Sequence, residues 1–179
     1  MLAALFLLAS SATGFGTEML TEILAGKVLC SNPDLVTKTC SSIASFSIAQ
    51  NGVVTETTEL LISPNQRLTL EMSSTVVIGG ATNCGAITLA EMKKGRLRIN
   101  GMPLPPDRNE IALSKILEKL GPMAGRKTCD VLRVEAGQLL KYGQVDRIDI
   151  KLPPKPVVWI SLDKRFIVAP HPIAAAPTP

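Results

Sequence analysis

Apolar and polar residues alternate along much of the chain, in short runs separated by turn residues. Within 42–50, for example, Ala44, Phe46 and Ile48 take every second position. A period of two is typical of strands with one buried face. On this pattern and on β-branched content we predict short strands over 27–30, 42–50, 53–62, 67–72, 75–78, 84–89, 96–99, 129–134, 138–142, 146–152, 157–162 and 165–168.

The pair Asn51-Gly52 joins two of these strands and is the strongest local hairpin signal. A strict two-residue turn there would place Ile48 opposite Thr55, so that an apolar side chain meets a polar one. We therefore expect a bulge or a longer loop that shifts the register of the hairpin.

The period becomes helical between 108 and 120. Asp107 and Glu110 have the chemistry of a capping box, and Gly121-Pro122 ends the run. A shorter amphipathic helix is predicted over 17–25, with Gly26 at its stop position. The apolar stripe of the longer helix must cover the sheet, and it consists of Ile111, Leu113, Ile116, Leu117 and Leu120.

These elements predict an α+β fold. We expect a curved, mostly antiparallel sheet or partly closed barrel, packed on one main helix (about 108–120), plus a short N-terminal helix. The spacings between strands are too short for the helical crossovers that parallel strands need. The sequence leaves open whether the barrel closes.

The chain begins with an apolar run, Leu2–Ala9, followed by the small residues Ser10-Ser11-Ala12. This order is typical of a secretory signal, although no Lys or Arg precedes the run. We predict a signal peptide at 1–12 or to 14, a single disulfide-stapled globular domain at 17–169, and a disordered Pro/Ala-rich tail at 170–179. The protein is then periplasmic or secreted. The alternative is a buried N-terminal helix of a cytosolic protein.

Four cysteines, Cys30, Cys40, Cys84 and Cys129, allow three disulfide pairings. One pairing joins Cys30 to Cys40 and Cys84 to Cys129. Their gaps do not match the close ligand pairs of zinc sites or the C-x-x-C of thioredoxin-like pairs. In an exported protein we expect disulfides and no metal site.

Charge adds little. The net charge is +4, and the only basic cluster is Lys93, Lys94, Arg96 and Arg98. Aromatic residues that would stack on bases are missing from it, so we expect no specific nucleic-acid binding. The basic balance predicts at most weak attraction to anionic envelope surfaces. We expect a monomer.

No residue set predicts catalysis, and we expect no cofactor. Ser161-x-x-Lys164 lacks the companion motifs of β-lactamases, and His171 lies in the predicted tail. Glu56 and Glu59 are three residues apart in a predicted strand, so they point to opposite faces and are expected to be solvated surface acids.

The best candidate site is the loop that a Cys30–Cys40 bridge would close, bearing Asn32, Pro33, Asp34, Leu35 and Lys38. A preorganised loop loses little entropy on association. We therefore expect a non-catalytic binding module that contacts a protein or envelope component through surface loops. One alternative is a carrier of a small apolar ligand in a half-barrel, which an internal cavity above about 300 Å³ would favour. Another is a hydrolase with an unusual site, which polar groups with perturbed pKa in a cleft would favour.

Overall fold

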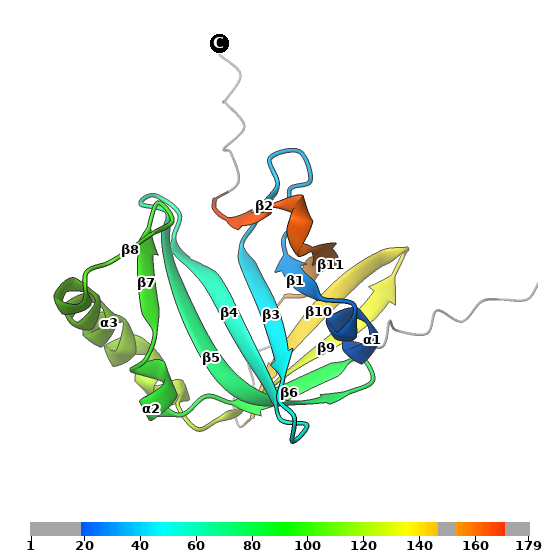
Figure 1. Ribbon diagram of the computed structural model, residues 1–179, viewed down its shortest axis with the longest axis horizontal. Coiled ribbons are helices and arrows are strands. Elements are labelled where there is room, and N and C mark those ends of the chain that lie inside the picture. Colours follow the sequence, from blue (N-terminus) through cyan, green and yellow to red (C-terminus); the bar gives the residue numbers. More distant parts are fainter. Residues whose placement is uncertain (1–18, 147–152, 171–179) are drawn as a thin grey trace, which may run out of the picture.

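The computed structural model describes residues 19–146 and 153–170 (Figure 1). The predicted signal peptide, most of the predicted tail and nearly all of the predicted strand 146–152 lie outside the described residues. The predicted fold class is confirmed: the protein is α+β, with an antiparallel barrel, one main helix and a short N-terminal helix. The helices are α1 (Met19–Leu24), α2 (Leu89–Met92) and α3 (Pro106–Leu120), and 3₁₀ turns follow at Gly121–Met123 and Leu162–Lys164.

The described strands run in an order that closes on itself. They are β1 (Lys27–Ser31), β2 (Thr39–Cys40), β3 (Ser42–Ile48), β4 (Val54–Ser63), β5 (Leu68–Gly79), β6 (Thr82–Ala86), β7 (Arg96–Ile99), β8 (Met102–Pro103), β9 (Lys127–Glu135), β10 (Gln138–Val145), β11 (Lys155–Ser161) and β12 (Ile167–Val168). The barrel order is β4-β3-β1-β11-β10-β9-β6-β5, and β5 pairs back with β4. The long strand β5 also carries β7 and β8 as an extension.

The hairpin register follows the expected shift. Ile48 lies opposite Val54, one residue away from the pairing of a strict two-residue turn. A longer loop produces this shift, in which the Ala49 amide donates to the Val53 carbonyl (2.9 Å). The same register places Phe46 opposite Glu56 on the inner face of the barrel.

Apolar clusters occupy both ends of the barrel interior. At one end α1 inserts Met19 and Ile23 among Leu29, Leu132 and Val157. At the other end α3 covers the inner face of β4, β5 and β7 with Leu113, Ile116, Leu117 and Leu120, as predicted. Ile111 was wrongly included in the stripe: it is 63% exposed, because two residues before Leu113 a helix turns its side chain to the opposite side. The cluster at this end is centred on Leu70, Leu97 and Leu113.

A third apolar cluster lies outside the barrel. Cys30 and Cys40 are fully buried there with Val28 and Ile160, and Phe166 packs against them. This cluster holds the small parallel pair β2–β12 on the outer face of β1 and β11. It therefore fixes the base of the loop between Cys30 and Cys40.

Three local predictions were wrong. The runs 67–72 and 75–78 form one strand, β5, because it pairs with β4 across Ser73 and Ser74. The predicted strand 84–89 ends at Ala86, and α2 follows. The capping box predicted at Asp107 and Glu110 does not form, since α3 starts earlier and its N-cap is Pro105 without a side-chain bond.

Candidate functional site

The loop closed by Cys30 and Cys40 protrudes from the barrel at the top of Figure 1. Asp34 organises its tip: Oδ1 accepts from the amides of Val36 (2.9 Å) and Thr37 (3.0 Å). The backbone of Asp34 also pairs with Thr39 in both directions, at 2.8 and 3.1 Å. The tip is therefore a small closed turn on a disulfide-anchored base.

The base of this loop is tied to the barrel by further bonds. The Asn32 amide donates to the Pro156 carbonyl (2.7 Å), and Asn32 Nδ2 donates to Ser41 Oγ (2.9 Å). Asn32 and Lys38 both have positive φ, 48° and 53°, in the left-handed region that side chains adopt at a cost. The anchors on either side hold the backbone there, so the loop is preorganised.

Two apolar side chains project from the tip. Leu35 is 67% exposed and Val36 is 92% exposed, on a turn that the Asp34 carboxylate bonds internally. Ile167 lies beside the loop, because its amide donates to the Lys38 carbonyl (3.1 Å), and it is also exposed. An apolar patch therefore adjoins the disulfide loop.

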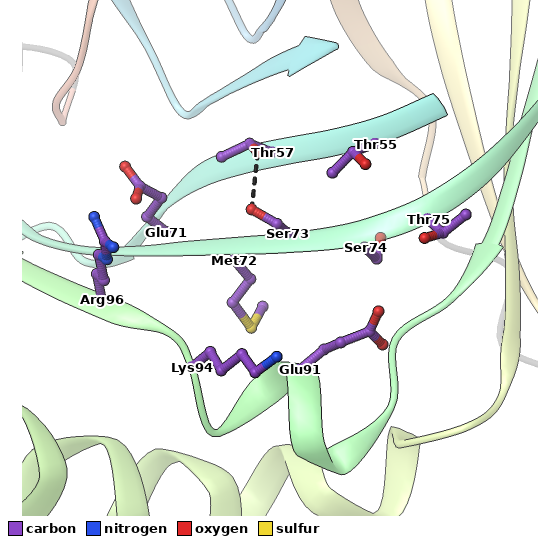
Figure 2. Close-up of a pocket in the computed structure, with 10 residues that line it drawn as sticks. All are labelled: Thr55, Thr57, Glu71, Met72, Ser73, Ser74, Thr75, Glu91, Lys94 and Arg96. Carbon is purple, nitrogen blue, oxygen red and sulfur yellow. Dashed lines mark hydrogen bonds between the residues drawn. The ribbon is translucent and has the colours of Figure 1, made fainter. Parts of the chain in front are cut away.

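A second feature is a cleft of about 450 Å³ in the barrel wall (Figure 2). β5 pairs with β7 up to Glu71 and with β6 only from Val76 onwards. Between these ladders the edge of residues 72–75 faces α2, and none of the described strands pairs with it. Hydroxyl groups of Thr57 and Thr75 line the cleft, and Lys94 stands on the opposite wall.

The charges of the cleft are largely balanced within the protein. Glu91 closes a capping box with Thr88, whose amide and hydroxyl both donate to Glu91 Oε2 (2.7 Å each). The backbone hydrogen bond from Thr88, then its side-chain bond, and more weakly nearby Lys94 lower the pKa of Glu91 below 4.5. A carboxylate made less basic is the opposite of what a general base needs.

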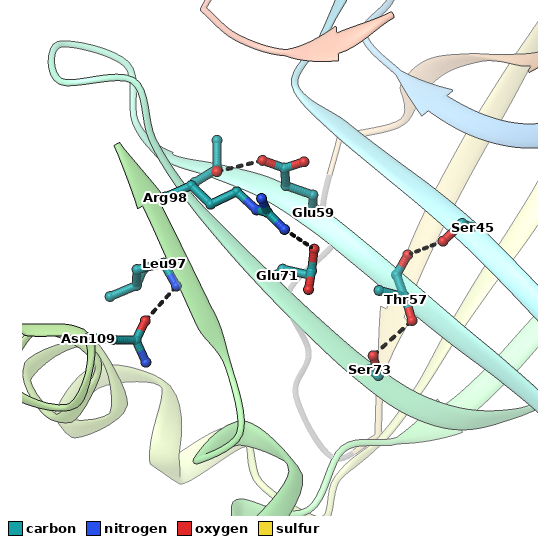
Figure 3. Close-up of polar contacts among 9 residues, drawn as sticks. Ser45, Thr57, Glu59, Glu71, Ser73, Leu97, Arg98 and Asn109 are labelled. Carbon is teal, nitrogen blue, oxygen red and sulfur yellow. Dashed lines mark hydrogen bonds and ion pairs between the residues drawn. The ribbon is translucent and has the colours of Figure 1, made fainter. Parts of the chain in front are cut away.

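The outer face beside the cleft is a bonded polar surface (Figure 3). Arg98 Nη2 pairs with Glu71 Oε2 at 3.0 Å, and the Thr69 hydroxyl donates to Glu59 Oε1 (2.6 Å). The hydroxyls of Thr57 and Ser73 meet across β4 and β5 at 2.8 Å. The basic cluster seen in the sequence is thus interrupted by acids and forms no uniform positive patch.

A third feature is a cavity of about 180 Å³ inside the barrel, between the two apolar ends. Strand register places Glu56 and Asn83 on its inner face, with Asp130 directly across from Asn83. Asn83 Nδ2 donates to Glu56 Oε2 (2.6 Å), and the Thr58 hydroxyl donates to Glu56 Oε1 (2.8 Å). A carboxylate–amide–carboxylate row therefore crosses the cavity.

Only part of this row is neutralised. Lys141 Nζ lies 3.2 Å from Asp130 Oδ2, which leaves two carboxylates facing one ammonium group. Asn83 is 6% exposed, and no described residue donates to its Oδ1. Trp159, which packs on Phe46 with ring centroids 6.1 Å apart, likewise keeps a buried Nε1 without an acceptor among the described residues.

The sequence predicted the loop between Cys30 and Cys40 but not the polar row inside the barrel. All five predicted loop residues lie together between the bridged cysteines, and the bridges are Cys30–Cys40 and Cys84–Cys129. Glu56 and Glu59 do point to opposite faces, but Glu56 lies in the barrel and is not a surface acid. No local signal marked Asn83 and Asp130, because only barrel closure brings them to Glu56.

In the part of the chain that the structure describes, no cluster of three or more His, Cys, Asp or Glu side chains is arranged to hold a metal ion. Nor does any described helix reach the length and apolarity that crossing a bilayer requires. Comparisons with protein-family models, curated proteins and solved structures gave no significant match.

Proposed function

We propose that this protein is a non-catalytic extracytoplasmic binding module that docks on an exported protein through the tip of the Cys30–Cys40 loop. The observation that carries the proposal is the pair Leu35 and Val36, exposed at the tip of a turn that is fixed by a disulfide and by Asp34. A turn that is already ordered loses little conformational entropy on association, so little of the binding free energy from its apolar contacts is offset by ordering.

The proposed cellular location is based on the two disulfides. Two disulfides indicate an oxidising environment, since reducing compartments keep thiols open. The predicted signal peptide narrows this to a periplasmic or secreted protein. A partner that meets the loop must then be exported or face the same compartment.

The other functions have less support. The cavity inside the barrel holds about 180 Å³ and carries two carboxylates, whereas an apolar carrier needs a larger apolar space. The acid with a shifted pKa in the wall cleft, Glu91, is shifted by its capping box and away from basicity. Neither feature favours an apolar carrier or a hydrolase over a docking loop.

Photo-crosslinking tests the proposal. A benzophenone amino acid replaces Val36 in the mature oxidised protein, and a control protein carries it at Met102, an exposed residue of β8. Expression in the source organism should give one discrete protein adduct from position 36 and no matching adduct from position 102. Adducts of equal pattern at both positions, or adducts to lipid alone, would contradict docking on a protein.

Competition makes the test quantitative. Excess wild-type protein present during irradiation should suppress formation of the adduct, while the double variant Leu35→Ser/Val36→Ser should compete at least about tenfold less well, because a few anchor side chains carry most of the energy of an interface. Both side chains are exposed, so thermal unfolding of the variant should match the wild type. If the variant competes as well as the wild type, the loop tip is not the binding surface.

A further inference from the structure

We infer that the cavity inside the barrel binds a small organic cation with N–H donors, a primary ammonium or guanidinium compound, between Glu56 and Asn83. This site is separate from the docking loop and does not depend on it. One part of its lining is apolar, and the polar part offers two carboxylates, hydroxyl groups and the side-chain carbonyl oxygen of Asn83.

The unpartnered oxygen of Asn83 is the observation that points to a ligand. The amide must turn its NH₂ toward Glu56, because a carboxylate only accepts, and Nδ2–Oε2 is 2.6 Å. This choice leaves Oδ1 buried with no donor from any described residue. Leaving a buried acceptor unpaired is costly, so the position calls for a donor that the described chain does not supply.

Charge selects the same class of ligand. Glu56 and Asp130 face the cavity, and among the described residues Lys141 is the cation paired with this row. Lys141 is paired with Asp130, whereas the donors bonded to the Glu56 carboxyl, Thr58 and Asn83, are both neutral. A cation that donates from nitrogen meets both the charge of Glu56 and the oxygen of Asn83.

Size limits the ligand. An apolar cavity of about 150 Å³ accommodates benzene, so about 180 Å³ takes a compound of about six to eight non-hydrogen atoms. The wall cleft offers a route, because Met72 and Ser74 line both the cleft and the cavity. Among the described residues no strand pairs with β5 at these two positions on the side of β6 and β7, and Figure 2 draws both side chains at the cleft.

The sole tryptophan provides the assay. Trp159 packs on Phe46, and Phe46 lies directly across from Glu56, so a ligand at Glu56 changes the surroundings of the indole. n-Butylammonium and guanidinium are titrated into the oxidised protein at constant ionic strength, with n-butanol and tetramethylammonium as controls. For a ligand of this size we expect a dissociation constant between about 10 µM and 10 mM.

The expected result is a saturable fluorescence change with the two N–H cations. n-Butanol, which lacks the charge, and tetramethylammonium, which lacks N–H donors, should bind at least about tenfold more weakly. The side-chain amide resonances of Asn83 should shift during the same titration. Equal binding of either control would overturn the assigned chemistry, and so would saturable binding of Ca²⁺ in place of the amines.

Matched variants locate the site. Glu56→Gln keeps the shape but removes the charge, and it should weaken n-butylammonium binding at least about tenfold. Glu59→Gln changes the same residue type on the same strand, on the outer face, and should alter binding less than about twofold. Circular dichroism and thermal unfolding of both free variants report whether each still folds.

A second interior variant guards against a folding artefact. Ile23→Val removes one carbon from the apolar cluster around α1, away from the cavity lining, and binding should stay within about twofold of the wild type. Loss of binding in Ile23→Val and Glu59→Gln as well as in Glu56→Gln, or unchanged binding in a folded Glu56→Gln, would overturn the assignment.

Discussion

Replacing Cys84 and Cys129 together by alanine removes the crosslink between β6 and β9 without emptying the core. The two residues are direct register partners, and they lie on the outer face of the barrel because Asn83 and Asp130 beside them point inward. The change therefore acts mainly on the unfolded chain, which gains the freedom that the bridge had removed.

The magnitude follows from the sequence separation of 45 residues. In the chain-entropy model a loop of that length contributes about 4 kcal/mol to the free energy of unfolding. The Cys30–Cys40 bridge, with a separation of 10, contributes about 3 kcal/mol. Small domains have about 5–15 kcal/mol in all, so opening both bridges removes a large part of it.

Urea unfolding followed by tryptophan fluorescence measures the effect. The Cys84→Ala/Cys129→Ala variant should lose about 4 kcal/mol, and its denaturant slope should rise because the unfolded chain is less compact. The wild type in a strong reductant should lose more than this variant. A loss below about 1 kcal/mol with an unchanged slope would refute the reasoning that this bridge constrains the unfolded chain.

Three further predictions concern single side chains. Leu113→Ala should cost about 2–5 kcal/mol in urea unfolding, since this α3 side chain is almost fully buried against Leu70 and Leu97, and a loss under 1 kcal/mol would contradict the packing. Thr88→Ala should raise the pKa of Glu91 toward 4.5, as measured by NMR titration. In the wild type the capping box stabilises the folded protein above pH 4.5, and this contribution is lost as the pH falls through the lowered pKa of Glu91. Tyr142, the sole tyrosine, should ionise above pH 10.0 in an ultraviolet titration, chiefly because its hydroxyl donates a hydrogen bond to Glu135. This bond stabilises the folded protein below pH 10, and its contribution is lost as the pH rises through the raised pKa of Tyr142; a titration midpoint at 10.0 would exclude the bond.

Much of the fold could be predicted because its signals are local. Alternation located most of the strands, the helical period located α3, and the conflict at Asn51-Gly52 predicted the register shift that is seen. The predicted ends of two strands were wrong because the local sequence signal was ambiguous there. Ser73 and Ser74 resemble a turn, yet β5 runs through them because β4 pairs along its length. Thr88 and Glu91 carry a capping-box pattern, but the apolar run before them favoured a strand.

The interior site could not be predicted, for a geometric reason. Glu56 and Asn83 are 27 residues apart, and alternation alone says only that each lies on one face of its own strand. Which face turns inward depends on the closure of the barrel, and closure depends on pairings such as β1 with β11 that join distant parts of the chain. The loop between Cys30 and Cys40 was predictable because its two cysteines are close in sequence.

The polar row also bears on why the interior is built as it is. Apolar clusters at both ends of the barrel show that this chain fills space with leucine, methionine and valine wherever packing is the only requirement. A half-buried pair such as Lys141 with Asp130 adds little net stability, because desolvation offsets much of its attraction. Glu56 with a buried, unpaired amide oxygen beside it adds further cost. A purely structural interior has no need of the Glu56 carboxylate or the unpaired Asn83 oxygen, whereas a site for a small cation would use both.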